Sequence, residues 1–289
     1  MDTYERIADL RHALNKERGL GKTIGFMPTL GALHEGHLSL LRRAREENDL
    51  VVMSVFVNPT QFNQIEDYEK YPRDLERDKK LAAGVGTQIV FAPSMEEMYP
   101  EGFDTVVAVR GLSDILEGAS RPGHFQGVAT VVAKLLNIVQ PTRAYFAEKD
   151  YQQLQVIRRL TLDLDIPTEI VPCATVREPD GLALSSRNVR LTPEERRAAT
   201  VLSRALKYVQ DIADTGVHDA FVLAGWLART IEVEPLAKLD YAVIVDRETL
   251  QEVERIDNSP IALVAATFGK VRLIDNRIIT PAPGLERRG

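Results

Sequence analysis

The stretch KTIGFMPTLGALHEGHLSLLRRAREENDLVVMSVFV, residues 22–57, contains one strand–helix–strand unit. KTIGFM is predicted as a short apolar strand, and PTLGALHEG is predicted as a turn. In HLSLLRRAREEN, Leu38 and Leu41 fall on an apolar face of a helix and Arg42 and Arg45 on a charged face. DLVVMSVFV is a continuous apolar run, typical of a parallel strand covered on both faces. This unit predicts an α/β fold.

The same alternation continues to residue 175. Further strands are predicted at TQIVFAP, DTVVAV, RAYFAE and TEIVPC, and helices at RDLERDKKLAAGVG, HFQGVATVVAKLLNIVQ and DYQQLQVIRRLTLDL. A first helix, with Thr3 as its cap, precedes the unit. The pattern predicts a doubly wound parallel-sheet (Rossmann-like) domain over residues 1–175, whose ligands bind at the carboxyl ends of the strands.

The pattern changes near residue 176. REPDGLALSSRN is polar and rich in turn residues, and LTPEERRAA begins a helix with Thr192 as cap, Pro193 at the first helical position and Glu195 at the third. Strands are predicted at DYAVIV, IALVAAT and VRLIDNRII, the last two joined by a hairpin turn in TFGKVR. Residues 176–289 are therefore predicted to form a smaller α+β domain, with a disordered tail in PAPGLERRG.

Composition excludes several classes of protein. The chain has 289 residues, a net charge of −6 and a pI near 5.5, which argues against a general nucleic-acid-binding surface. No apolar run approaches the length of a membrane span, and the charged amphipathic start is not a signal peptide, so the protein is expected in the cytoplasm. The single cysteine, Cys173, cannot form an internal disulfide and is expected to be a buried core residue.

Two histidines lie three positions apart where the first α/β turn enters its helix. A zinc protease motif places its histidines four positions apart, whereas His34 and His37 are one residue closer, and only His124 offers a nearby third ligand. Ordinary surface histidines are a second interpretation. Their position favours a third, because Gly31 and Gly36 let a ligand approach and a helix start offers free N–H groups and a positive dipole end. The residues alone favour a nucleotide phosphate site.

Several longer motifs, taken in order, add a resemblance to a known family. They are MPTLGALHEGHLSLLRRAR, SVFVNPTQFN, YPRDLERD, RPGHFQGVATVVAKLLNIVQP, FAEKDYQQLQVIRRL and REPDGLALSSRN, and they cover most of residues 24–190. In these motifs the chain resembles the pantothenate synthetase (pantoate–β-alanine ligase) family of the nucleotidylyltransferase superfamily. The resemblance implies a C–N-bond-forming ligase of pantothenate biosynthesis that joins (R)-pantoate to β-alanine through a pantoyl adenylate and releases AMP and pyrophosphate.

The resemblance also implies where ATP binds. The implied contacts are Leu30, Gly31, Ala32, Leu33, His34, Glu35, Gly36, His37, Ala147, Glu148, Lys149, Asp150, Val176, Leu184, Ser185, Ser186 and Arg187. Catalytic roles are implied for His34, His37, Lys149, Ser185, Ser186 and Arg187. In this scheme His37 stabilises the transition state at the α-phosphate, Asp150 accepts from a ribose hydroxyl, and LSSRN is a mobile clamp on the β- and γ-phosphates.

The acceptor substrates are implied to bind through neutral amides. The resemblance assigns pantoate to Leu30, Asn58, Gln61 and Gln153, and β-alanine to Gln61 and Arg121. Amides suit pantoate because they both donate and accept hydrogen bonds, and because a strong positive charge would weaken its carboxylate as a nucleophile. The chain departs from the usual family pattern at Leu30 and Leu184, where Met is common, and at Ala147, where Gly is usual.

ATP implies Mg²⁺, which often rides on the phosphates, so no protein ligand for a metal is expected. The resemblance further implies a homodimer. Two other functions remain open at this point. One is a different nucleotidylyltransferase of the same superfamily, and the other is a non-catalytic nucleotide-binding module.

Overall fold

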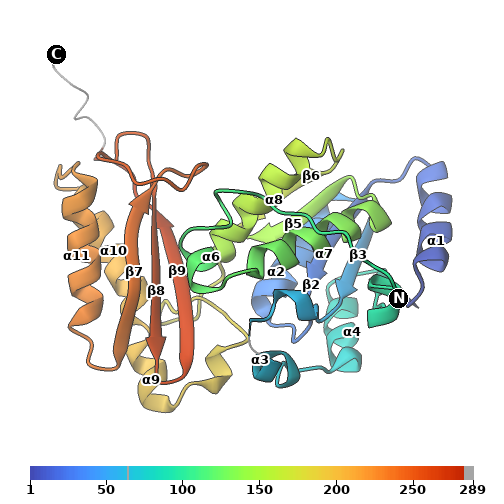
Figure 1. Ribbon diagram of the computed structural model, residues 1–289, viewed down its shortest axis with the longest axis horizontal. Helices are drawn as coiled ribbons and strands as arrows, with labels where there is room; N and C mark the ends of the chain where they lie inside the picture. Colours follow the sequence, from blue (N-terminus) through green and yellow to red (C-terminus); the bar gives the residue numbers. More distant parts are fainter. Residues whose placement is uncertain (64, 283–289) are drawn as a thin grey trace. The chain divides into compact units, whose positions relative to one another are not determined.

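The computed structural model describes residues 1–63 and 65–282. The chain divides into two compact units, Met1–Ala174 and Thr175–Gly289, and Figure 1 labels most of their helices and strands. The disorder expected for the tail falls largely on residues 283–289, which lie outside the described part of the chain.

The first unit is built on a parallel sheet of six strands in the order β1-β4-β3-β2-β5-β6. The strands are β1 (Asp2–Tyr4), β2 (Ile24–Thr29), β3 (Leu50–Val55), β4 (Ile89–Phe91), β5 (Arg143–Ala147) and β6 (Glu169–Cys173). A parallel sheet with crossover helices is the predicted α/β architecture, and the prediction is confirmed.

Helices cover both faces of this sheet. Alternate strand residues point to opposite faces, so Phe26 and Val52 join one apolar cluster with α1, α7 and α8, while Met27 and Val51 join another with α2 and α4. The longer helices are α1 (Ile7–Gly19), α2 (Glu35–Glu47), α4 (Leu75–Gly84), α7 (His124–Val139) and α8 (Tyr151–Asp163). The short ones are η1 (Pro59–Gln61), α3 (Ile65–Glu69), α5 (Met95–Met98), α6 (Glu117–Ser120) and η2 (Glu148–Asp150).

Two predicted elements were wrong. Thr3 does not cap a helix but pairs with Val90 in β1, and the first helix begins later, at Ile7. DTVVAV, residues 104–109, is not a strand, and its Val107 N–H donates instead to Thr130 Oγ1 of α7 at 2.9 Å. β1 pairs with β4 at the edge of the sheet, and the 104–109 segment bonds to a helix instead of to a strand.

The order of the strands places the topological switch point of the sheet between β2 and β5. From β2 the chain crosses to β3 on one side, and from β5 it crosses to β6 on the other, so the two neighbours flank the topological switch point of the sheet. In open α/β sheets ligands bind outside the carboxyl ends of the strands at such a point. The segments of interest are therefore those that follow Thr29 and Ala147.

The second unit packs helices on an antiparallel sheet of β7 (Ala237–Val245), β8 (Ile261–Phe268) and β9 (Val271–Ile278), in the order β7-β8-β9. Its helices are η3 (Asn188–Arg190), α9 (Pro193–Ala198), α10 (Val201–Ala213) and α11 (Ala220–Glu232). Thr192 caps α9 and Glu195 closes the capping box, and β8 and β9 form the predicted hairpin. The α+β character predicted for this part of the chain is confirmed.

Candidate active site

The two histidines form the N-terminal cap of α2. His34 Nδ1 accepts a hydrogen bond from the Gly36 N–H at 3.2 Å, and His37 Nδ1 accepts one from the His34 N–H at 3.3 Å. The ring centroids lie 4.1 Å apart. Because both Nδ1 atoms are acceptors, each neutral ring carries its proton on Nε2. The start of α2 therefore presents two imidazole N–H donors.

The surroundings keep both rings neutral. Burial, as the largest cause, together with the neighbouring His34 and Lys149 lowers the pKa of His37 to about 3, although Asp150 acts to raise it. Burial is also the main cause that lowers the pKa of His34. A neutral imidazole can donate to a phosphate at pH 7 without the desolvation cost of a buried cation.

Lys149 and Asp150 lie across the switch point, in the short helix η2 that follows β5. Their charges act on both imidazoles, so the structure brings the two predicted segments together. Lys149 Nζ lies 3.3 Å from Asp150 Oδ1, and the lysine side chain is 15% exposed. A partly buried cation near the start of α2 adds to the positive potential that an anion would meet.

Gln61 is held through its backbone carbonyl as well as through its side chain. Its carbonyl accepts from His124 Nδ1 at 2.8 Å and from Arg121 Nη2 at 3.3 Å, and its Oε1 accepts from Asn58 Nδ2 at 3.2 Å. Arg121 Nη1 lies 3.1 Å from His124 Nε2. Since arginine only donates, His124 Nε2 is the acceptor and Nδ1 carries the proton that Gln61 receives.

Asn58 contacts the side chain of Gln61 and is fully buried. Its Nδ2 donates to the Gly127 carbonyl at 3.2 Å, and its Oδ1 accepts from the Tyr99 hydroxyl at 3.0 Å. The predicted contact of Asn58 with pantoate stays a prediction, but this burial favours an indirect role through Gln61.

The neighbouring glutamines of α8 have opposite environments. Gln152 is buried and bonded to the 112–117 segment, donating to the carbonyls of Leu112 and Ile115 and accepting from the Glu117 N–H at 3.0 Å. Gln153 is half-buried, and its side-chain amide makes no hydrogen bond with the other described residues. Of the two, Gln153 has the side-chain amide that the surrounding described residues leave unused, and its predicted contact with pantoate stays a prediction.

Comparisons with known proteins show which family the chain belongs to. The family model described as pantoate-beta-alanine ligase matches residues 2–278. The chain belongs to the pantoate–β-alanine ligase family. It is 53% identical to the pantothenate synthetase of Moorella thermoacetica over 279 residues, which are 96% of this chain and 99% of the relative. A pantothenate synthetase from Roseiflexus sp. (strain RS-1) is 54% identical over the same shares of the two chains.

Solved structures of the family have the same fold. The pantothenate synthetase of Thermus thermophilus matches with a TM-score of 0.92 at 51% identity, covering 97% of this chain and 100% of that one. The pantoate-beta-alanine ligase of Francisella tularensis, solved as a complex with beta-gamma ATP and beta-alanine, matches with a TM-score of 0.77 at 38% identity, covering 96% and 97%. The chain is thus a ligase of pantothenate biosynthesis that joins pantoate to β-alanine with ATP.

The other residues after β2 that were predicted to contact ATP mostly shape or cover the turn that leads into α2. Gly31 and Ala32 adopt left-handed φ values of +96° and +52°, and Leu33 is buried. Glu35 is exposed and pairs with Arg42 on the outer face of α2. The backbone conformation of this turn, more than its side chains, therefore sets the path of the chain that leads to His34.

The predicted phosphate clamp belongs to the second unit. Leu184 N–H donates to the Val176 carbonyl at 3.0 Å, and Ser185 Oγ accepts from the Arg187 N–H at 3.2 Å. At its base, Arg177 holds Asp275 of β9 with two bonds of 2.7 and 2.8 Å. These hydrogen bonds fix the residues next to the LSSRN segment within the second unit. The mobility of the segment and the phosphate contacts of Ser185, Ser186 and Arg187 stay predictions.

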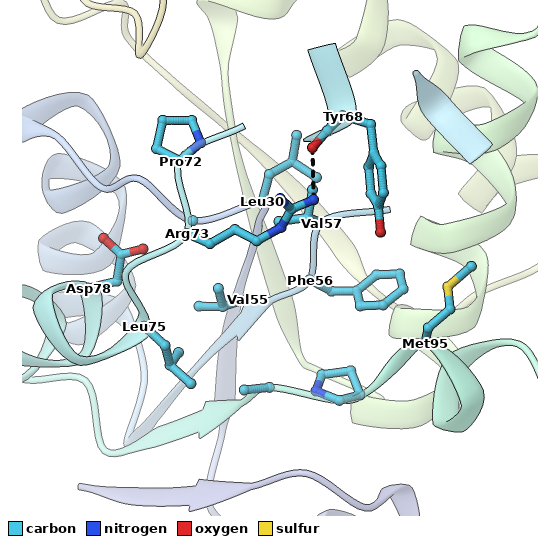
Figure 2. A pocket seen from close by; sticks show the side chains of 13 residues that line it. Leu30, Val55, Phe56, Val57, Tyr68, Pro72, Arg73, Leu75, Asp78 and Met95 are labelled. Carbon is cyan, nitrogen blue, oxygen red and sulfur yellow. Dashed lines mark hydrogen bonds between the residues drawn. The ribbon is translucent and has the colours of Figure 1, made fainter. Parts of the chain in front are cut away.

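A pocket of about 270 Å³ lies at the carboxyl ends of β3 and β4. Figure 2 shows its mainly apolar lining, with Arg73 bonded to the Tyr68 carbonyl at 2.8 Å. Of the predicted site residues only Leu30 and Gly31 line it. Its wall also includes Asp78, a buried acid for which sequence reasoning predicted no role.

Within the described residues, no three His, Cys, Asp or Glu side chains are grouped so that they could hold a metal ion. In that same part of the chain, no helix combines the length and apolarity needed to cross a bilayer.

Proposed function

We propose that the chain forms pantothenate in two steps at the β2–β5 crevice. In the first, a carboxylate oxygen of (R)-pantoate bonds to the α-phosphorus of ATP, the bond to the β-phosphate oxygen breaks, and pyrophosphate leaves. In the second, the amine of β-alanine bonds to the acyl carbon of pantoyl adenylate, loses a proton, and AMP leaves. The observation that carries this proposal is the meeting of two neutral histidines with Lys149 and Asp150 across the switch point.

The histidines and Lys149 supply the electrostatic part of the first step. The Nε2–H groups of His34 and His37 donate to phosphate oxygens, and Lys149 adds a positive charge, so the charge that builds up on the α-phosphate is stabilised. Asp150 accepts from a ribose hydroxyl. No proton transfer by His37 is needed, since the carboxylate nucleophile has none to lose.

Pantoate and β-alanine occupy the amide side of the crevice. Gln61 and Gln153 donate to pantoate oxygens, Leu30 contacts its gem-dimethyl group, and Asn58 orients Gln61 from below. Fixed amides hold the carboxylate in line with the α-phosphorus at small entropic cost. Arg121 attracts the β-alanine carboxylate from its position beside the Gln61 carbonyl.

The clamp acts on the outer phosphates. Ser185, Ser186 and Arg187 contact the β- and γ-phosphates, and the planar guanidinium suits paired phosphate oxygens. Mg²⁺ would be carried by the phosphate oxygens of ATP and would neutralise phosphate charge when bound. We also propose a homodimer, which light scattering would test, and a cytoplasmic location, where ATP is supplied.

The deciding experiment is exchange of labelled pyrophosphate into ATP with Mg²⁺ and pantoate but without β-alanine. Pantoate-dependent exchange is expected, because pantoyl adenylate forms reversibly. A nucleotidylyltransferase with a different acceptor, or a passive nucleotide-binding module, would bind ATP without this exchange. His37→Ala should lower the exchange rate about a hundredfold, a typical effect of removing one transition-state donor. Wild-type exchange by that variant would overturn the role of His37.

A further inference from the structure

Asp78 lies beneath the turn that leads into α2. Its side chain is 1% exposed, and it comes from α4, at the end of the YPRDLERD motif. Oδ2 accepts from the Ala32 N–H and Oδ1 from the Leu33 N–H, both at 2.8 Å. Each carboxylate oxygen therefore holds one of two consecutive backbone amides.

The turn has a conformation that needs such support. Gly31 and Ala32 both have left-handed φ values, which cost free energy for an alanine. A Cβ on Gly31 would lie 3.0 Å from Asp78 Oδ2 and 3.2 Å from Val55 Cγ1, so the backbone sits close against the carboxylate. Hydrogen bonds to a charged acceptor are the stronger kind and offset the cost of the turn.

The contact also decides which groups face an anion. The amides of Ala32 and Leu33 are used by Asp78, so the first donors available to a phosphate come from His34 and His37 at the start of α2. Arg77 Nη1 lies 3.4 Å from Asp78 Oδ1, which is longer than the two bonds to the turn, and the arginine side chain is exposed. Asp78 thus acts mainly on the turn, which sets the entry of the chain into the helix.

We propose that Asp78 is a positioning residue for the nucleotide: it holds the turn at residues 31–33 so that His34 caps α2 and both imidazoles face the phosphates of ATP. This inference rests on the proposed function of the histidines. Asp78 touches no substrate in this role, and its effect is carried by the two backbone amides.

The test is Asp78→Asn, with Asp49→Asn as its matched control. Asparagine keeps the size of the side chain but turns one acceptor into an NH₂ group that faces a backbone N–H. Asp49 is also a carboxylate that accepts from a backbone amide, Thr23 N–H at 2.9 Å, but it lies at the amino end of the strands, away from the site. Losing one bond to a charged acceptor should raise the KM for ATP about tenfold in pyrophosphate exchange. The KM for pantoate should stay within about twofold.

A merely structural role gives a different result. Lower stability would reduce kcat through the folded fraction and leave the KM for ATP unchanged, and that outcome overturns the proposal. Direct titration with ATP measures the affinity without turnover: the proposal expects weaker ATP binding by Asp78→Asn, whereas a merely structural role leaves the affinity unchanged. The proposal is therefore still tested if wild-type protein fails to exchange pyrophosphate. Such a failure would count against the proposed function alone.

Amide hydrogen exchange measures directly how well the backbone amides of the turn are protected. In Asp78→Asn, exchange at Ala32 and Leu33 should be faster than in wild type, while Asp49→Asn should leave both amides protected. If Asp78→Asn does not fold, Gly31→Ala disturbs the same contact from the turn side, because its Cβ meets Oδ2 at 3.0 Å and its φ is left-handed. Unchanged ATP affinity in the variant that folds would overturn the proposal.

Discussion

The side chain of Asn58 donates to Oε1 of Gln61 at 3.2 Å, and this contact determines which end of the Gln61 amide is free. The orientation of Asn58 is fixed by groups of known polarity, because its Nδ2 faces the Gly127 carbonyl and its Oδ1 faces the Thr60 N–H. Gln61 must then direct its NH₂ group elsewhere, and that group bonds to no described residue. In the proposed function, this NH₂ group is the one that donates to pantoate.

Tyr99→Phe should weaken pantoate binding specifically. The variant removes only the hydroxyl that donates to Asn58 Oδ1 at 3.0 Å, so the orientation of Asn58 and Gln61 is held less firmly. The KM for pantoate should rise about three- to tenfold, as expected for one hydrogen bond, while the KM for ATP stays near the wild-type value. Steady-state kinetics check this, with Tyr208→Phe in the second unit as control. Equal changes in both KM values would contradict the assigned role.

Gly127→Ala should disturb the same region through the backbone. A Cβ there would lie 2.4 Å from the Thr60 carbonyl oxygen and 2.7 Å from the Gln61 nitrogen, so α7 and η1 would have to separate. We expect lower thermal stability together with a higher KM for pantoate. Gly225→Ala is the matched control, because this glycine also lies inside a helix but a Cβ added to it would meet no neighbouring heavy atom within 4 Å. That control should stabilise the protein by about 0.5–1 kcal/mol. Similar thermal shifts in the two variants would contradict the close packing at Gly127.

The first unit was predictable from sequence because its strands are buried on both faces. Runs such as the one at residues 50–57 stay apolar throughout, and each is followed by a helix with a clear apolar face. β1 gave no such signal, since its three residues are largely exposed and belong to the sheet only through pairing with β4. Local pattern cannot reveal a pairing partner 87 positions along the chain, as Thr3 and Val90 illustrate.

The site was predictable where motif and topology agree. His34, His37, Lys149 and Asp150 follow neighbouring strands, so a parallel sheet alone brings them to one edge. Asp78 and Tyr99 were missed because their roles depend on which backbone or side-chain group lies opposite, and residue type does not encode that. The burial of Asn58 was missed for the same reason, since an amide in a turn ordinarily suggests solvent.

Cys173 should behave as an inert core thiol. It is buried in β6, and burial raises its pKa to about 11, so the reactive thiolate is scarce at neutral pH. Native protein should react slowly with a thiol-specific disulfide reagent and completely after unfolding. Cys173→Ser should retain turnover when folded but lose stability, because a hydroxyl is harder to bury than a thiol. Rapid labelling of native protein, or loss of pyrophosphate exchange in folded Cys173→Ser, would point to a role beyond packing.

The pKa of His37 makes a prediction about stability as well as catalysis. Below pH 6.5 the unfolded chain binds a proton at His37, whereas the native ring stays neutral until about pH 3. The unfolded state therefore binds more protons across this window, so the free energy of unfolding falls as pH falls from 6.5 towards 3, by up to about 1.4 kcal/mol per pH unit from this group. Denaturant melts at several pH values should give a shallower dependence for His37→Gln, in which glutamine can still accept from the His34 N–H. Exposed His12→Gln is the control and should follow the wild-type curve.

In the same window pyrophosphate exchange by the wild type should lack an inflection from His37 near pH 6.5, and an inflection there that His37→Gln abolishes would mean that the ring is charged when it acts.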